Sequence, residues 1–182
     1  MTLLKNDTVS LRALEPEDLD WLYRWENDPE LWQYGPTLAP YSRFTLRDYL
    51  SNALSQDIFQ SRQLRLMIVE NSSQQPIGTV DLYDIDPIHL RAGIGILLDA
   101  AYRGKKLSPQ VLELMHEYAS CILLLHQLYA YVPENNPSSY KLFQRSGYEE
   151  AGVLKSWLKT AEGYQDVHFM QRFLDLPVAK SQ

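Results

Sequence analysis

A strand, a basic turn and a helix follow one another between residues 91 and 114. Residues 91–98, RAGIGILL, are apolar and partly β-branched with small residues interleaved, which indicates a buried strand. Ser108-Pro109 indicates a helix start, because a serine hydroxyl caps a free amide and proline at the first helical position loses no hydrogen bond. An apolar face then recurs at helical spacing, at Val111, Leu112, Met115, Ala119 and Ile122. This unit predicts a helix packed on a sheet.

The turn before that helix is suited to an anion. The free amides and the positive dipole end of a helix start favour phosphate oxygens, and Gly104 lets a ligand approach the backbone. Arg103, Lys105 and Lys106 add positive charge, and a solvated loop with surface cations is the alternative interpretation. The spacing fits neither a Walker loop nor a dinucleotide fingerprint, so a nucleotide bound in either of those modes is not expected.

Composition narrows the classes of function. The chain has 182 residues, 45% of them hydrophobic, which is enough for one core. Its net charge of −6 argues against a nucleic-acid binder and is compatible with a cationic substrate. No membrane span or export signal is visible, so a cytoplasmic protein with no membrane partner is expected. The single cysteine, Cys121, is expected to be buried and inert, and no metal site is indicated.

The remaining segments complete an α/β pattern. We predict strands at 8–14, 64–70, 77–85, 128–132, 153–158 and 164–173, helices at 15–28, from Thr45-x-x-Asp48 onwards and at 136–147, and an irregular stretch at 30–43. That order suits a mixed sheet with helices on its faces. No linker or repeat divides the chain, so we expect a single domain over residues 1–174 and a polar tail over 175–182.

Two motifs resemble those of the GNAT superfamily of N-acetyltransferases. The turn resembles the family's Gln/Arg-x-x-Gly-x-Gly/Ala loop, with Lys106 and Ser108 where small residues are usual. The stretch 136–148, NPSSYKLFQRSGY, resembles the family's Asn-x-x-Ala/Ser-x-x-Leu-Tyr-Glu-Lys-x-Gly-Phe in order and spacing. The segments LRALEPEDLDWLYRWENDPELW and VDLYDIDPIHLRAGIGILL resemble the bacterial branch that acetylates ribosomal-protein N-termini and polyamines.

The resemblance implies a GNAT-like, mostly antiparallel central sheet and acetyl-CoA as co-substrate. It implies a pyrophosphate site on the turn, at Arg103, Gly104, Lys105, Lys106, Leu107 and Ser108. It places the pantetheine arm and the thioester carbonyl at backbone groups of Ile96, Leu97 and Leu98, and further cofactor contacts at Asn136, Ser139 and Phe143. Asn136 has N-capping as an equally good interpretation.

Direct attack of an amine on the thioester is the simplest chemistry that the resemblance implies. Phe143 stands where many members of this branch carry a tyrosine, and phenylalanine cannot donate a proton. Tyr140 shares a helix face with Phe143 and is the best local substitute as proton donor, and Ser138 and Ser139 are weaker candidates. Two other interpretations remain open: water donates the proton, or the protein is slow or inactive. Asp84 is the preferred base.

Asp81 is the second choice of base, and we expect it to point to the opposite face of the strand from Asp84. His89 and His168 are less favoured bases.

The acceptor is the least defined part of the hypothesis. We expect a primary amine, either a peptide or protein N-terminus or a small polyamine-like or antibiotic amine. Residues 34–40 lack the acidic cluster of the polyamine enzymes that the chain resembles, which argues against a polyamine effector site and weakens polyamine as substrate. Trp25, Trp32, Tyr34 and Tyr41 are candidates for an acceptor pocket or for the core.

Two other functions are compatible with the sequence. One is a non-catalytic acyl-CoA-binding or regulatory domain, favoured by Phe143 and Lys106, and the other is an unrelated anion-binding protein. An exposed edge in the closing hairpin would permit a homodimer.

Overall fold

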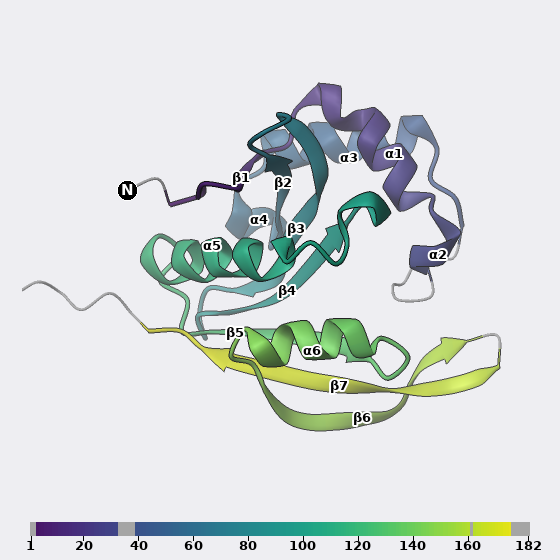
Figure 1. Cartoon of the computed structure of the whole chain (residues 1–182), viewed down its shortest axis with the longest axis vertical. Coiled ribbons are helices and arrows are strands. Elements are labelled where there is room, and N and C mark those ends of the chain that lie inside the picture. The colour runs from purple at the N-terminus through teal and green to yellow at the C-terminus, as the bar shows by residue number, and fades with distance from the viewer. Residues whose placement is uncertain (1–2, 33–38, 161, 176–182) are drawn as a thin grey trace, which may run out of the picture.

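The computed structural model describes residues 3–32, 39–160 and 162–175. They form one sheet of seven strands in the order β1-β2-β3-β4-β5-β7-β6. Every neighbouring pair is antiparallel except β4 and β5. The mixed, mostly antiparallel α/β fold expected from the sequence is confirmed (Figure 1).

The elements follow the predicted order. The strands are β1 (Val9–Ala13), β2 (Leu64–Glu70), β3 (Gln75–Asp86), β4 (Arg91–Leu98), β5 (Gln127–Pro133), β6 (Glu149–Thr160) and β7 (Gly163–Phe173). The helices are α1 (Leu19–Glu26), α2 (Pro29–Trp32), α3 (Arg43–Ser55), α4 (Ile58–Ser61), α5 (Leu107–Cys121) and α6 (Pro137–Arg145), with 3₁₀ turns η1 (Pro16–Asp18) and η2 (Ala100–Tyr102).

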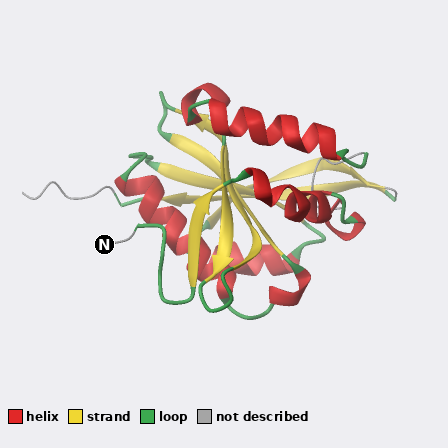
Figure 2. Cartoon of the chain, turned by 90° about the horizontal axis from the view of Figure 1, so that it is seen from above, coloured by secondary structure: helices red, strands yellow, loops and turns green. Residues whose placement is uncertain are grey.

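Helices cover both faces of the sheet, as Figure 2 shows. The larger core joins α5 and α6 to one face and includes Ile94 and Leu98 of β4. A smaller core on the other face joins α1 and α3 to the sheet around Leu22, Trp25 and Met67. Leu97 packs against this smaller core, as the alternation of side chains along a strand requires. We call these the α5 face and the α1 face.

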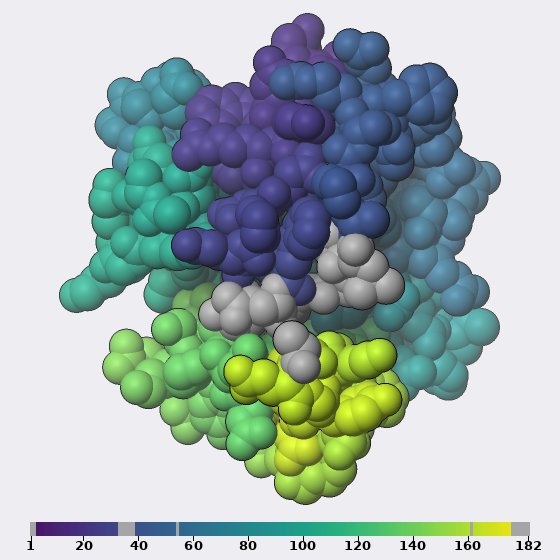
Figure 3. Space-filling view, turned by 90° about the vertical axis from the view of Figure 1, so that its right-hand side faces the viewer, coloured from purple at the N-terminus to yellow at the C-terminus, as the bar shows by residue number. Residues whose placement is uncertain are grey.

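The strands β4 and β5 separate along their length. They pair only over residues 91–93 and 127–129. Beyond that point β4 stays with β3 as far as Leu98, and β5 stays with β7 as far as Pro133. We call the divergent part, residues 94–98 and 130–133, the strand fork. In Figure 1 it falls between the part of the molecule built from β1–β4 and the part built from β5–β7. Figure 3 shows the N-terminal part, in purple and blue, above the C-terminal part, in green and yellow.

The central helix begins earlier than expected. Its N-cap is Lys106, with a left-handed backbone (φ 59°) and no side-chain cap, so Ser108 lies inside the first turn. Val111, Leu112, Met115 and Ala119 are buried as predicted. The prediction that Ile122 belongs to the apolar face of this helix is wrong, because the helix ends at Cys121 and Ile122 is exposed. The expected burial of Cys121 is also wrong, because this last residue of α5 is exposed.

Smaller corrections concern the N-terminal half. Helix α3 is capped by Ser42, whose hydroxyl accepts the Thr45 amide, and not by a capping box from Thr45 to Asp48. The stretch predicted as irregular contains α2 and the first residue of α3, because Asp28 turns the chain directly into a new helical turn. Both predicted hairpins are confirmed, and so is the short helix that Asn136 caps.

Candidate active site

The backbone of β4 offers hydrogen-bonding groups to the strand fork. The Asp99 amide donates to the Ile77 carbonyl of β3 at 2.9 Å. In an antiparallel pair every second residue directs its amide and carbonyl to the same neighbouring strand, so Leu97, two residues earlier, also faces β3. The groups of Ile96 and Leu98, one residue out of phase, face the fork. The Leu98 carbonyl already accepts from Arg103 Nε at 3.0 Å. Of the three predicted positions, Ile96 therefore has its amide and carbonyl directed into the fork, and Leu97 does not.

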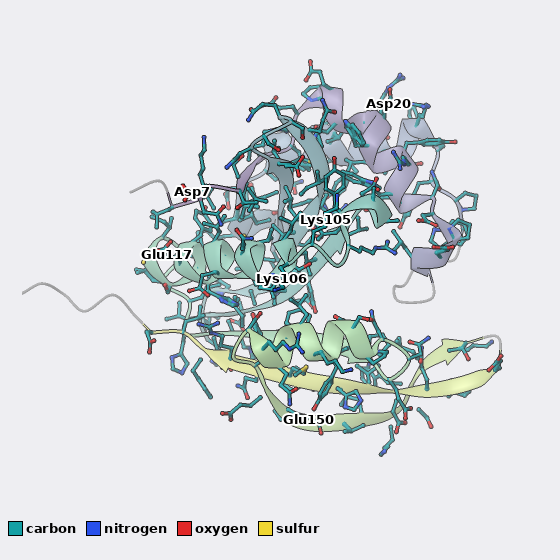
Figure 4. All side chains as sticks on the ribbon, viewed as in Figure 1. Asp7, Asp20, Lys105, Lys106, Glu117 and Glu150 are labelled. Carbon is teal, nitrogen blue, oxygen red and sulfur yellow. The ribbon has the colours of Figure 1, made fainter. Side chains whose placement is uncertain are left out.

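The basic turn presents amides at the start of α5. Gly104 and Lys106 both have left-handed backbones, φ 75° and 59°. Lysine adopts this conformation at a cost of about 1–2 kcal/mol relative to glycine, which explains why a small residue is usual in the motif that the turn resembles. Lys105 Nζ lies 4.7 Å from the centre of the Tyr102 ring. Figure 4 places Lys105 and Lys106 at the N-terminal end of α5, where an anion benefits from the helix dipole.

Beside the turn lies a charged hollow of about 240 Å³ that includes Arg24, Asp28 and Arg103. The Asp99 carboxylate accepts from the Trp25 indole at 3.0 Å and lies 3.1 Å from Arg24. Burial tends to raise the pKa of Asp99, but these two groups and the Ala101 amide bring it below its usual value. Asp99 thus ties helix α1 to the end of β4, and Trp25 belongs to the core.

Helix α6 starts where β5 ends, at the open end of the fork. Asn136 Oδ1 accepts a hydrogen bond from the Ser139 amide at 3.1 Å, so Asn136 caps this helix. Phe143 is only 3% exposed and packs edge-on against Tyr148, 5.0 Å between ring centres. Phenylalanine at this position is therefore a core residue.

Tyr140 points away from the fork. Its hydroxyl donates to Glu150 Oε2 at 3.2 Å, and its ring packs edge-on against His168. His168 Nδ1 lies 2.7 Å from the same Glu150 oxygen. Glu150 is on β6, the edge strand, and Figure 4 shows it on the far side of the molecule from Lys105. The structure does not bring Tyr140 together with Ile96.

The aspartates of β3 lie in different surroundings. Asp81 is paired with Gly95 in register, and its carboxylate accepts from Arg65 Nε at 2.5 Å; Arg65 also pairs with Glu26 at 2.6 Å. Burial raises the pKa of Asp81, and Arg65 opposes that effect. Asp84 is exposed in a left-handed bulge (φ 49°), so the bulge, more than strand alternation, sets its direction.

An aromatic wall on the α1 face was not anticipated. It consists of Tyr83, Tyr129, Tyr131 and Phe169, with ring centres 5.3–6.1 Å apart from one to the next. Phe169 is paired with Tyr131, whereas their neighbours Val132 and His168 face α6. The signal in the sequence was the pair Gly93 and Gly95, which removes side chains from one face of β4 and leaves room for the Tyr83 ring.

The comparisons with known proteins agree with this geometry. A model of the acetyltransferase (GNAT) domain matches residues 8–149. The chain belongs to the GNAT acetyltransferase family. It is 30% identical over 165 residues to a spermidine N(1)-acetyltransferase of Vibrio cholerae, covering 91% of this chain and 92% of that one. Identity to the ribosomal-protein-serine acetyltransferase of Escherichia coli is 23% over 178 residues, covering 96% and 97%.

Solved structures extend the likeness. The Vibrio cholerae spermidine N-acetyltransferase in complex with CoA and spermine superposes with a TM-score of 0.83 at 27% identity, covering 92% of this chain and 96% of that one. A dodecameric structure of the Vibrio cholerae enzyme gives a TM-score of 0.80 at 25% identity, covering 97% and 100%.

The family membership confirms the main expectation from the sequence. This GNAT protein is an acetyl-CoA-dependent N-acetyltransferase, and acetyl-CoA is its co-substrate. Nothing in the comparisons favours the non-catalytic alternative. Within the described residues, no helix is long and apolar enough to cross a membrane. Tyr34, one candidate for the acceptor pocket, lies outside the described residues.

Proposed function

We propose that this GNAT enzyme acetylates a primary amine of a small polyamine-like cation by direct attack on acetyl-CoA in a ternary complex. The aromatic wall carries the proposal. Ring faces attract ammonium groups and pack well against methylene chains. Tyr131 is 43% exposed, so part of the wall is open to a ligand. The net charge of −6 and the named activity of the Vibrio cholerae relative support the same substrate class.

In this proposal the two substrates meet at the strand fork from opposite faces. Acetyl-CoA lies on the α5 face, with its pyrophosphate on the amides between Gly104 and Ser108. The Ile96 amide, directed into the fork, polarises the thioester carbonyl and stabilises the oxyanion. Asn136 and Ser139 at the start of α6 border the cofactor arm, and the buried Phe143 anchors that helix in the core. The amine approaches from the α1 face along the aromatic wall.

We assign Asp84 as the general base that takes the proton of the attacking amine. Burial raises the pKa of Tyr129 and of Tyr83, and the Asp84 carboxylate lies close enough to the wall to raise both further. The proton reaches Asp84 directly or through one water. Asp81 is less available, because Arg65 occupies its carboxylate. Protein and peptide N-termini, the other acceptors expected from the sequence, are the competing outcome of the test below.

A substrate panel tests this proposal. Release of the CoA thiol is measured with spermidine, spermine, putrescine and peptides with serine or alanine N-termini. We expect the highest kcat/KM for a polyamine, and a preference for peptides would overturn the acceptor assignment. Acetyl-CoA at one hundred times its Kd is expected to raise the stability of the protein by about 2.7 kcal/mol, and ATP is not.

The proposal also covers the domain structure, the location and the oligomeric state of the protein. One domain over residues 1–174, a cytoplasmic location and a homodimer or larger oligomer are parts of it. Self-association is supported by the hairpin of β6 and β7, where Trp157 on the edge strand β6 and Tyr164 on β7 are 59% and 68% exposed. Light scattering after size exclusion measures the assembly, and a monomer at all concentrations would remove this part of the proposal.

A further inference from the structure

The strand fork needs a proton donor that α6 does not supply. When the amine displaces CoA, the thiolate leaves with a negative charge and is stabilised by a proton. Phe143 carries no acidic proton and is buried in the core. Tyr140 already donates its hydroxyl proton to Glu150, on the far strand β6. Another group at the fork has to provide the proton if the reaction is to be fast.

Tyr83 reaches the fork from the next strand. It is paired with Gly93 in register, and its ring occupies the space that a side chain at Gly93 would fill: an ideal Cβ there would lie 2.1 Å from Tyr83 Cε2. The ring edge comes within 3.9 Å of the corresponding point on Gly95. The Tyr131 amide on β5 lies near this hydroxyl, close enough to oppose the rise in its pKa. The Tyr83 side chain therefore spans β4 and ends between the two strands as they separate.

The Tyr83 hydroxyl carries its proton at neutral pH. Burial is the largest effect and raises the pKa of Tyr83; the neighbouring Tyr129, Tyr131 and Asp84 raise it further, and the Tyr131 amide opposes them. The phenol therefore keeps its proton at neutral pH. A phenol has one O–H donor, which in this geometry can point to an acceptor in the fork.

We propose that Tyr83 donates the proton that the CoA thiolate receives. The assignment rests on the proposed function, since it requires acetyl transfer to an amine at the fork. The amine nitrogen forms a bond to the acetyl carbon, the carbon–sulfur bond breaks, and its electron pair takes the Tyr83 proton to give the thiol. The N–H proton of the amine passes to Asp84 and to water, and water returns a proton to the tyrosinate.

Three variants test the assignment with acetyl-CoA and the best amine of the panel. Tyr83→Phe keeps the ring and removes the proton, and we expect kcat to fall about a hundredfold, the usual contribution of a general acid. Gly93→Ala keeps the hydroxyl but displaces the ring, and we expect a comparable loss. Tyr118→Phe removes a half-buried hydroxyl on α5, which packs on the opposite face of the sheet from the aromatic wall, and serves as the matched control with a loss of less than about threefold.

A change of leaving group separates chemistry from packing. An acetyl thioester of an acidic aryl thiol needs no proton on its departing sulfur, so Tyr83→Phe and wild type are expected to react with it at equal rates. An equal loss with both donors would show a structural role and overturn the assignment. Full activity of Tyr83→Phe with acetyl-CoA would do the same and leave the proposed function standing. Absence of transfer to any amine by wild type would overturn both.

Discussion

The two sides of the strand fork are built in different ways. On the cofactor side, the binding groups are backbone amides of one continuous segment, from Ile96 through the turn to the first residues of α5. On the acceptor side, the groups are side chains from β2, β3, β5 and β7, brought together by strand register. A site made of amides tolerates substitution, as the left-handed Lys106 shows. A site made of side chains depends on each residue and on the contacts that hold it.

The largest effect is expected where the acceptor side depends on a buried charge. Arg65→Met removes the partner of Asp81 and Glu26, and leaves the buried Asp81 without its cationic partner. We expect a loss of about 3 kcal/mol in the free energy of unfolding, measured by denaturant titration. Arg43→Met, which breaks the exposed pair with Asp20, is the control and should cost far less. Equal losses would show that Arg65 contributes only as a surface charge.

The next effect concerns the base on the acceptor side. Asp84→Asn keeps the size of the side chain and removes its negative charge, and we expect kcat/KM for the amine to fall about a hundredfold. The affinity for acetyl-CoA should not change, because the carboxylate lies on the other side of the fork. Asp81→Asn is the comparison, and a larger catalytic loss there would exchange the two assignments.

A moderate effect on the pH dependence of stability is expected from a buried histidine of α5, on the cofactor side. His116 of α5 lies buried between Tyr148 and Arg172, whose guanidinium lies 2.8 Å from its Nδ1. Burial, and then Arg172, lower the pKa of His116 to about 3. The unfolded chain, with a histidine pKa near 6.5, binds more protons below that pH, so stability falls as pH falls.

Between pH 7.5 and 5.5 this histidine is expected to remove about 1.4 kcal/mol of the free energy of unfolding. His116→Gln removes the titrating ring and should remove that part of the pH dependence. If the free energy of unfolding had the same pH dependence in the wild type and in His116→Gln, the lowered pKa of His116 would be contradicted.

The smallest effect is expected within the turn. Lys106→Gly keeps every amide and relieves the left-handed backbone, so the Kd for acetyl-CoA should stay within about threefold. Gly104→Val at φ 75° is the matched variant, and isothermal titration should show a loss of at least about tenfold, because a β-branched residue is strained there. A large loss for Lys106→Gly would show that the lysine charge outweighs the amides.

The sequence by itself determined the features that depend on neighbouring residues. The strand and turn before α5, the hairpins, the cap at Asn136 and the family motif were all predictable, because capping and periodicity act over a few residues. The exact start of α5 was not, because Lys106 adopts a left-handed backbone that lysine does not favour by itself.

Only the tertiary structure decided which side chains meet at the fork. Tyr140 was the local substitute for the missing tyrosine, but helix α6 turns it to Glu150, whereas Tyr83 crosses β4 where Gly93 leaves room. Register also turned the backbone of Leu97 to β3 and kept Asp81 with Arg65. These contacts join residues far apart in the chain, and local sequence preferences carry no information about such pairings.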